Sequence, residues 1–223
     1  MKLYGYYRSS ASYRIRIILN LKGIAWENRP VMLNRDEQRA ATFRTINPMR
    51  LVPVLDIGDA MLAQSAAIAE YLEETFPAPP LLPGEPLLRA QVRELQHLIG
   101  CDIHPLQNLR VLKHLRAEFG QDDAGVEEWC RKWIGAGFEA YEAIAAKRSA
   151  SGLYSIGDSL SLADAWLVPQ LYNARRFGLD LAPFPTIAAI GEHCLSLDPI
   201  AAAHPDRQPD AQMVTVGPNH SRA

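Results

Sequence analysis

Apolar runs and helical repeats alternate over residues 1–80. Short apolar runs predict strands at residues 2–7, 26–31, 52–56 and 61–63. Apolar positions three or four residues apart predict helices at 12–22, 36–43 and 65–75. The residues Ile57-Gly58-Asp59 have the composition of a hairpin turn between the last two strands. The resulting order, βαβαββα, predicts an α/β domain.

The pattern changes at residues 77–86, where five of the ten residues are proline. Proline fixes φ and lacks an N–H group, so a semi-rigid joint is expected there. Amphipathic stretches follow at 87–119, 127–147, 162–176 and 185–197, the third opened by a capping box from Ser161 to Asp164. We therefore expect a first domain at 1–82 and an all-α domain at 87–210. The polar, proline-rich chain from about Pro205 is expected to be extended or loose, with a flexible tail at 211–223.

Composition and charge limit the classes of function. The 223 residues are 48% hydrophobic and 22% charged, as in ordinary globular proteins. No apolar run approaches the roughly 20 residues that span a bilayer, and the N-terminus lacks a signal-peptide pattern. We therefore expect a cytoplasmic protein without a membrane partner. Residues 1–50 contain ten basic but only three acidic residues. This imbalance favours a small ligand with several carboxylates, whereas the acidic remainder of the chain and the absence of a nucleic-acid motif argue against nucleic acid.

Cysteine and histidine spacing gives no metal signature. Cys101, Cys130 and Cys194 are far apart, form no CxxC motif and fall in predicted helices, which is typical of small core residues. His97 and His104 are seven residues apart but have no carboxylate partner in their pattern. No metal site is expected.

The segment from Ser9 to Ser12 has the greatest chemical interest. It places three hydroxyls where the first strand passes into the first helix. A helix N-terminus has N–H groups without intrahelical partners and the positive end of the helix dipole, so it favours an anion. The same field lowers the pKa of a thiol bound there. Simple N-capping by serine explains the motif equally well at this stage.

Other segments suit an extended anionic ligand. Val52 precedes Pro53 at the start of a strand and could pair with an extended backbone, although the local sequence favours a trans bond before the proline. Ser65 is expected to N-cap a helix after Gln64, giving a second anion site. Six further polar residues could bind a ligand, although an exposed charge or a local hydrogen bond would also explain each of them: Arg8, His104, Asn108, Arg110, Arg175 and Arg176. His104 and Asn108 are four residues apart, so we expect them on one helix face.

These motifs resemble the zeta class of glutathione transferases, and within it the maleylpyruvate and maleylacetoacetate isomerases. The similarity runs without a gap from residue 1 to about residue 210. Its most specific motifs are Tyr7-Arg8-Ser9-Ser10-Ala11-Ser12-Tyr13-Arg14-Ile15-Arg16-Ile17 and the pair His204-Pro205 with Arg207-Gln208-Pro209-Asp210. Further matches are Leu51-Val52-Pro53-Val54-Leu55, Gln64-Ser65, Asp102-Ile103-His104-Pro105-Leu106-Gln107-Asn108 and Leu162-Ala163-Asp164.

The resemblance implies a fold, a cofactor and a reaction. The fold is the glutathione transferase fold, with a thioredoxin-like N-terminal domain and an all-α C-terminal domain, usually in a homodimer. The cofactor is glutathione. The reaction is the cis–trans isomerisation of a maleyl diketo acid in aromatic catabolism, maleylpyruvate to fumarylpyruvate or maleylacetoacetate to fumarylacetoacetate. It proceeds by thiolate addition, bond rotation and elimination.

The resemblance also implies residue roles. Ser9 and Ser10 are expected to hold the glutathione thiolate, and Arg8 and Arg176 to bind substrate carboxylates. The cis-proline motif Val52-Pro53 pairs with the cysteinyl backbone in this family, and Gln64 and Ser65 bind the γ-glutamyl end. The remaining residues expected at the glutathione site are Ala11, Gln38, His104, Asn108 and Arg110.

One position departs from the family, and some questions stay open. Zeta-class motifs usually have cysteine where this chain has Ala11, which disfavours any mechanism that needs a thiol there. A transferase of the same class acting on α-haloacids is the alternative, and a non-catalytic glutathione transferase-like module is a third reading. The resemblance leans towards maleylpyruvate, but no residue separates it from maleylacetoacetate on physical grounds.

Overall fold

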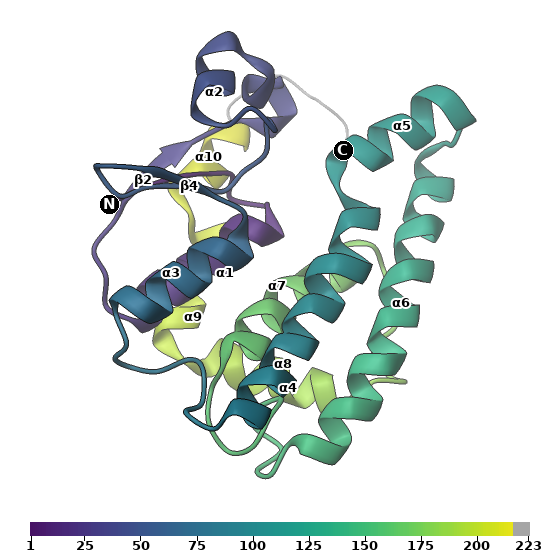
Figure 1. Cartoon of the computed structure of the whole chain (residues 1–223). Helices are drawn as coiled ribbons and strands as arrows, with labels where there is room; N and C mark the ends of the chain where they lie inside the picture. Colours follow the sequence, from purple (N-terminus) through teal and green to yellow (C-terminus); the bar gives the residue numbers. More distant parts are fainter. Residues whose placement is uncertain (216–223) are drawn as a thin grey trace. The chain divides into compact units, whose positions relative to one another are not determined.

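The computed structural model describes residues 1–215, which form two compact units. One unit contains residues 1–79 together with residues 198–215, and the other contains Pro80–Leu197. Figure 1 shows the course of the chain through both. The C-terminal residues therefore return to the first unit, whereas the sequence grouped residues up to 210 with the helical domain.

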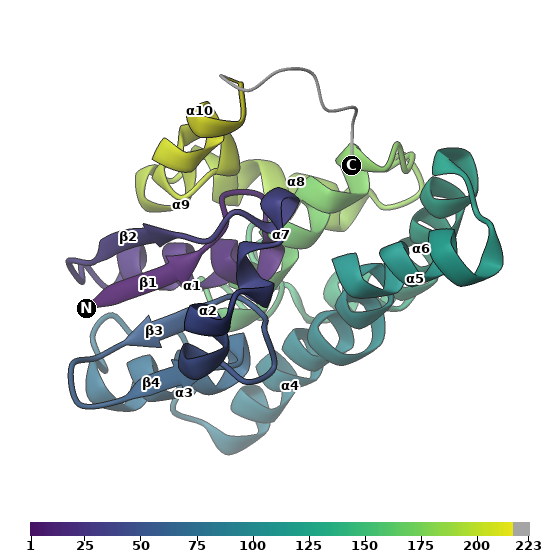
Figure 2. The ribbon, with the colours of Figure 1, turned by 90° about the horizontal axis from the view of Figure 1, so that it is seen from above.

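A four-stranded sheet organises the first unit. The strands are β1 (Lys2–Gly5), β2 (Glu27–Pro30), β3 (Val54–Asp56) and β4 (Met61–Ala63). Their order is β2-β1-β3-β4, and it can be followed in Figure 2. β1 runs parallel to β2 and antiparallel to β3, which pairs antiparallel with β4. The parallel pair requires a crossover connection, which α1 (Ser10–Leu21) supplies.

Apolar side chains cover both faces of this sheet. On one face Tyr4 and Val54 pack with Phe43 of α2 (Ala41–Ile46). Leu3 and Leu55 alternate with these residues along their strands and therefore point to the other face. On α1, Ile15, Ile17, Ile18 and Leu19 are fully buried, and α1 packs along α3 (Ser65–Thr75). The site described below lies at the N-terminal ends of these two helices.

The element order βαβαββα is confirmed, with one local difference. A helix was expected at 36–43, but the chain forms two 3₁₀ turns, Leu33–Arg35 and Glu37–Arg39, before α2. Asp36 has a left-handed φ of 55°, which no continuous α-helix tolerates. The helical repeat in the sequence therefore corresponds to three short pieces.

The C-terminal segment is helical and packs on the first unit. It contains α9 (Asp198–Ala202), a 3₁₀ turn at Pro205–Arg207 and α10 (Pro209–Thr215). Asn20 donates to the Pro199 carbonyl, and Arg16 to the Ala203 carbonyl. The expectation of loose chain from Pro205 is wrong, because Asp210 accepts hydrogen bonds from the Tyr7 amide and from Asn28 Nδ2. Of the tail expected at 211–223, residues 211–215 are helical and the rest lie outside the described residues.

The second unit is built mainly of helices, with an isolated β-bridge between Ser149 and Gly157. The helices are α4 (Pro86–His97), α5 (Leu109–Phe119), α6 (Asp123–Arg148), α7 (Leu162–Arg176) and α8 (Pro185–Ser196). Their common core includes Phe138, Tyr141 and Trp166, each at most 1% exposed. α6 approaches its neighbours closely at Gly137, where an added Cβ would lie 2.2 Å from Ile103 Cδ1. The all-α prediction for this part is confirmed.

The amphipathic stretch at 87–119 is not one helix. α4 gives way to a π-helical segment, Leu98–Ile103, and to a 3₁₀ turn, His104–Gln107, before α5 begins. Pro105 cannot donate to an α-helical ladder, and Asn108 adopts an extended conformation as the N-cap of α5. The hydrophobic pattern continues through the break because each piece has a packing partner: α4 packs against α7, and α5 packs against α6.

The proline-rich joint is attached at each end to the unit beside it. Lys22 Nζ donates to the carbonyls of Phe76 and Pro79. Further along, the Leu81 carbonyl accepts from the Leu162 amide, and Pro86 is the first residue of α4 with Glu85 as its N-cap. Within residues 1–215, no helix combines the length and apolar character needed to cross a membrane.

Candidate functional site

The first turn of α1 is capped by Ser9. Ser9 has extended backbone angles, and its Oγ accepts a hydrogen bond of 3.3 Å from the Ser12 amide. The Ser9 carbonyl accepts from the Tyr13 amide at 2.8 Å, which starts the intrahelical ladder. Both readings of the sequence motif thus apply to the same residue, because a capping serine stands at the end of the helix that favours an anion.

The three hydroxyls of this segment differ in their surroundings. Ser12 is fully buried, and its Oγ accepts from the Tyr6 amide at 3.4 Å. Ser10 is the first helical residue and is 4% exposed, whereas Ser9 is half-buried. Ser12 therefore has a structural role below the turn, and Ser9 and Ser10 are the hydroxyls nearest the helix start. Burial raises the pKa of the Tyr6 phenol well above its ordinary value, so this neighbour stays protonated.

The charges around this turn favour a bound anion. The first turn of α1 contains no acidic residue. Arg8 precedes the cap, and its guanidinium lies 5.8 Å from the centre of the Tyr7 ring. Asp210 is the nearby carboxylate, and it accepts from the Tyr7 amide at 2.7 Å. A thiolate at this helix start would experience the helix dipole without a competing carboxylate from the helix itself.

The start of α3 differs from the prediction in one detail. Ser65 was expected to be the N-cap, but Gln64 is the N-cap and Ser65 is the first helical residue. Gln64 has a φ of 71°, an unusual value for a residue with a side chain, and it makes no side-chain capping bond. The correction arises because the hairpin strand β4 ends at Ala63 and leaves one residue to turn the chain. α3 has no acidic residue in its first turn, so this second helix start also favours an anion.

Arg14 is a site residue that the sequence reasoning missed. Its side chain is 2% exposed, and its Nη1 donates to Ser65 Oγ at 3.2 Å, which links α1 to the start of α3. A buried guanidinium places a permanent positive charge below this helix start. The available signal was an arginine between apolar residues on the buried face of a predicted helix, where a polar partner is required.

The peptide bond between Val52 and Pro53 is cis. The expectation of a trans bond from local sequence is wrong, and the cis bond implied by the family resemblance is confirmed. β3 begins only at Val54, whose strand partner is Ala63. Val52 thus precedes the strand ladder.

Gln38 is the remaining predicted residue of the first unit. It is 8% exposed, and its Nε2 donates to Asp36 at 3.1 Å. Its Oε1 is buried and has no hydrogen-bond partner among residues 1–215. Such an acceptor usually receives a bond from a ligand or water.

The predicted residues of the helical unit lie on two segments. His104 opens the 3₁₀ turn, and Asn108 caps α5 by accepting from the Arg110 amide at 3.1 Å. The expectation that His104 and Asn108 share one helix face is wrong, because the chain is extended at Asn108. Arg176 ends α7 with its guanidinium 4.4 Å from the centre of the Phe177 ring, and its side chain is exposed.

The cysteines are not all core residues. Cys130 and Cys194 are buried, and burial raises the pKa of Cys130 to about 11 and that of Cys194 further. These two thiols are therefore unreactive at neutral pH. Cys101 is exposed, which corrects the expectation for that position. Residues 1–215 contain no cluster of three potential metal ligands.

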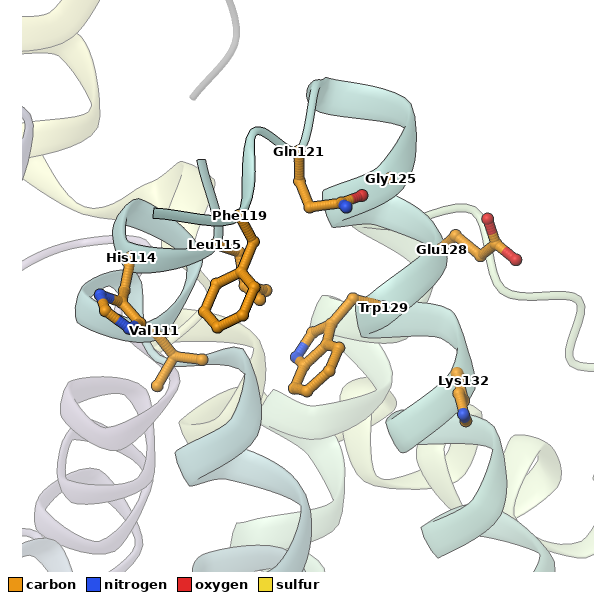
Figure 3. A pocket seen from close by; sticks show the side chains of 9 residues that line it. All are labelled: Val111, His114, Leu115, Phe119, Gln121, Gly125, Glu128, Trp129 and Lys132. Atoms are coloured by element: carbon orange, nitrogen blue, oxygen red, sulfur yellow. The ribbon is translucent and has the colours of Figure 1, made fainter. Parts of the chain in front are cut away.

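The helical unit contains a cavity of about 620 Å³ between α5 and α6. Figure 3 shows its lining, which includes Val111, Phe119 and Trp129. None of the predicted site residues lines it. The lining thus shares no residue with the two helix starts that carry the candidate chemistry.

Comparison with known proteins places this geometry in a family. The family described as "Glutathione S-transferase, N-terminal domain" matches residues 3–80. The maleylpyruvate isomerase of Ralstonia sp is 49% identical over 211 residues, which cover 95% of this chain and all of that protein. A solved holo structure described as a maleylpyruvate isomerase of the zeta class has a TM-score of 0.93 and 49% identity, covering 94% of this chain and 99% of that one. The chain belongs to the zeta class of glutathione transferases.

Another solved structure shows what a related protein binds. The maleylacetoacetate isomerase of Methylobacterium extorquens AM1, described with bound malonate and glutathione, has a TM-score of 0.91 and 41% identity. The match covers 94% of this chain and 99% of that one. The glutathione transferase fold expected from the sequence is confirmed, and glutathione is the cofactor of these zeta-class relatives.

The residues of this zeta-class chain fit glutathione. The tripeptide has a thiol, two carboxylates and amide groups. The first unit offers a serine-capped helix start, a second helix start above a buried arginine, and a buried amide oxygen at Gln38. These are the donors and acceptors that such a ligand requires.

Proposed function

We propose that this zeta-class protein catalyses the glutathione-dependent cis–trans isomerisation of a maleyl diketo acid. The observation that carries the proposal is the near-half identity to a maleylpyruvate isomerase over almost the whole of both chains. The local chemistry agrees, because the α1 start has a capping serine and no acidic residue in its first turn. A thiolate is the species that such a helix start stabilises.

Two helix starts divide the work of binding glutathione. Ser9 and Ser10 face the thiol, and the dipole of α1 favours its deprotonated form. Ser65 and the α3 start bind the γ-glutamyl carboxylate, with the Arg14 guanidinium adding positive charge from below. Val52 offers backbone groups to the cysteinyl part, and Gln38 offers its unpaired Oε1. The support for these roles is donor chemistry and location within the first unit.

The isomerisation needs a temporary loss of the double bond. When bound, glutathione supplies a thiolate whose reversible addition turns the carbon–carbon double bond into a single bond about which the substrate can rotate. The protein's own groups must stabilise the negative charge that develops on the substrate oxygen, for which the Ser10 amide and Arg8 are the proposed donors. Arg176 is proposed to bind a terminal carboxylate and orient the substrate.

His104, Asn108 and Arg110 are proposed to reach the glutathione region, and this assignment rests on the family resemblance. The homodimer expected for the family and the cytoplasmic location also stay predictions. Size-exclusion chromatography with light scattering measures the first. A fluorescent fusion observed in the source cell measures the second.

Absorbance measurements with the two diketo acids test the function directly. The protein, glutathione and either maleylpyruvate or maleylacetoacetate are mixed, and conversion is followed against glutathione alone. The proposal expects rapid conversion of at least one acid, and a side-by-side comparison of kcat/KM identifies the better substrate. Conversion no faster than with glutathione alone would exclude the isomerase.

Transferase activity on α-haloacids is the alternative, because it would use the same thiolate. Rates on dichloroacetate and on the diketo acid separate the two activities. Turnover of the haloacid alone would favour the transferase. A non-catalytic module would neither turn over substrate nor retain glutathione, and calorimetry with glutathione detects that outcome.

A further inference from the structure

The C-terminal motif ends on a buried carboxylate, Asp210, that is hydrogen-bonded to the loop of residues 6–9 between β1 and α1. Because this loop carries Arg8 and Ser9 of the proposed function, it is called the catalytic loop below. Asp210 is 1% exposed, and its Oδ2 accepts from the Tyr7 amide at 2.7 Å. Its Oδ1 accepts from Asn28 Nδ2 at 3.3 Å. Tyr7 directly precedes Arg8, and Ser9 follows. Asp210 thus binds the backbone two residues before the cap of α1.

Arg16 binds the other side of the same residue. Its Nη2 donates to the Tyr7 carbonyl at 2.8 Å, and its Nε donates to the Ala203 carbonyl at 3.0 Å. The Arg16 side chain is 3% exposed. Both polar groups of the Tyr7 backbone are therefore bound by charged side chains, one from α10 and one from α1. The Ser9 amide continues this arrangement by donating to the Tyr6 carbonyl at 3.0 Å.

We propose that Asp210 is a positioning residue for catalysis. It fixes the Tyr7 peptide, so Ser9 is presented to the thiol and Arg8 to the substrate in one geometry. Figures 1 and 2 both place α10 beside β2, on the unit that carries this loop. The chain therefore returns from the helical unit to complete the support of the site. This inference rests on the proposed function of Ser9 but concerns a buried residue to which we assign no contact with substrate or thiol.

Hydrogen bonds from buried, fixed side chains to a loop backbone are directional, so they hold the peptide in one orientation. A loop between a strand and a helix otherwise samples several conformations, and small misplacements of a reacting group lower rates strongly. The carboxylate of Asp210 accepts two hydrogen bonds, and the residue belongs to α10. It therefore limits the movement of the loop without occupying the site.

Substitutions at Asp210 test the role. Asp210→Ala removes the acceptor, and we expect kcat to fall by about tenfold and the pKa of the bound glutathione thiol to rise. Asp210→Asn keeps one oxygen for the Tyr7 amide, while Asn28 can turn its own amide to accept from the new NH₂ group. We expect this variant to retain activity within about twofold. The thiol pKa is read from the ultraviolet absorbance of the thiolate, without any diketo acid.

Asn20→Ala is the matched control. Asn20 Nδ2 donates to the Pro199 carbonyl of the same C-terminal segment, and Asn20 Oδ1 accepts from Trp26 Nε1. Among the described residues, none of its side-chain hydrogen bonds is to the catalytic loop. We expect it to lower the Tm while leaving kcat and the thiol pKa unchanged. If Asn20→Ala lowers kcat as much as Asp210→Ala, the segment acts through general stability and the proposal fails. Unchanged kcat and thiol pKa in folded Asp210→Ala also overturn it.

A second variant covers the case in which Asp210→Ala does not fold. Asp210→Glu keeps the charge and both acceptor oxygens but moves them by one methylene, which displaces the Tyr7 peptide. We expect a lower kcat for Asp210→Glu than for Asp210→Asn. The reverse order would show that charge, rather than the position of the loop, is the property that matters. Because the thiol titration needs only glutathione, a protein that binds glutathione but lacks isomerase activity still tests the inference.

Discussion

The N-termini of α1 and α7 have the same kind of cap but differ in the charge of their first turns. Each is capped by a serine, Ser9 in α1 and Ser161 in α7. In α7 the chain supplies its own anion, because fully buried Asp164 accepts from the amides of Ser155 and Ser161, both at 2.8 Å. In α1 the first turn contains no acidic residue. The positive end of α7 is thus neutralised from within, whereas that of α1 is available to a ligand.

This difference distinguishes a helix start that is only capped from one that can also bind an external anion. Serine at a helix start is common and indicates little by itself. A helix start can bind an external anion only when no carboxylate of the same turn already occupies the anion position. By that criterion α3 belongs with α1, since its first turn also lacks an acidic residue and Arg14 lies below it. The first turns of α2, α5 and α8 also lack an acidic residue, so this feature does not identify a site by itself. The proposed ends of glutathione are assigned to α1 and α3 because their starts combine it with Ser9 and with the Arg14–Ser65 contact.

Removing the Asp164 carboxylate from the first turn of α7 is expected to have the largest effect, a loss of stability. Asp164→Ala leaves two buried amides without an acceptor, so the free energy of unfolding should fall by about 3 kcal/mol or more. Urea unfolding followed by circular dichroism measures this change. Asp158→Ala, at an exposed aspartate nearby, serves as the control and should change stability by about 0.5 kcal/mol at most. Equal effects of the two substitutions would contradict the stabilising role of the Ser161–Asp164 capping box.

Adding an internal anion to α1 is the converse change. Ala11→Asp places a carboxylate in the first turn, where it competes with the thiolate for the helix dipole. We expect isomerase kcat/KM to fall by about tenfold or more and the pKa of the bound thiol to rise. Ala11→Asn has the same size without the charge and should lose less. Equal losses would assign the effect to crowding, since Ala11 is only 8% exposed.

Substitutions of the two capping serines should distinguish a loss of stability from a loss of catalysis. Ser9→Ala and Ser161→Ala should each lower the free energy of unfolding by about 1 kcal/mol, because each removes a cap. Only Ser9→Ala should also raise the pKa of the bound thiol and lower kcat. Thermal unfolding and thiolate absorbance, measured on both variants, make the comparison. An intact thiol pKa in Ser9→Ala would transfer the proposed role to Ser10.

The charge below α3 should have a smaller effect on binding. Arg14→Met removes the donor to Ser65, and we expect the Kd for glutathione to rise about fivefold, or ~1 kcal/mol. Arg14→Lys keeps the charge and should recover part of the affinity. Calorimetry with glutathione and with an analogue whose γ-glutamyl residue lacks its α-carboxylate gives the check. If Arg14→Met weakens both ligands equally, the arginine does not act through that carboxylate.

The smallest expected effect concerns pH. Burial raises the pKa of Asp164 in the folded state, so at pH values between its unfolded and folded pKa the folded state binds more protons. The contribution of this group to stability therefore grows as the pH falls towards the unfolded pKa of about 3.9 and is lost as the pH rises.

Urea titrations of the wild type and Asp164→Asn over this range measure the difference. Asp56 has the opposite sign, because the Gly58 amide and Lys2 lower its pKa, so its stabilisation is lost on acidification. Asp56 is present in both proteins and cancels. A wild-type advantage that shrinks with falling pH would contradict the prediction.

Local patterns located most elements but not the turns between them. The capping box at Ser161 was predictable because its serine and aspartate contact each other across one helical turn. Ser65 was not, because its place as first helical residue depends on where β4 ends and on the left-handed Gln64. The stretch at 87–119 was predicted as continuous, since both helices and the break between them follow one apolar pattern.

The sequence by itself determined the order of elements, the helical second part and the serines at the start of α1. Each depends on contacts within a few residues, and the family motifs added glutathione to that picture. Only the tertiary structure decided which buried charges support the site. Arg14 reaches Ser65 and Asp210 reaches Tyr7 across 51 and 203 positions of the chain. Such contacts leave no periodic trace in the sequence, because they form only when packing brings separate segments together.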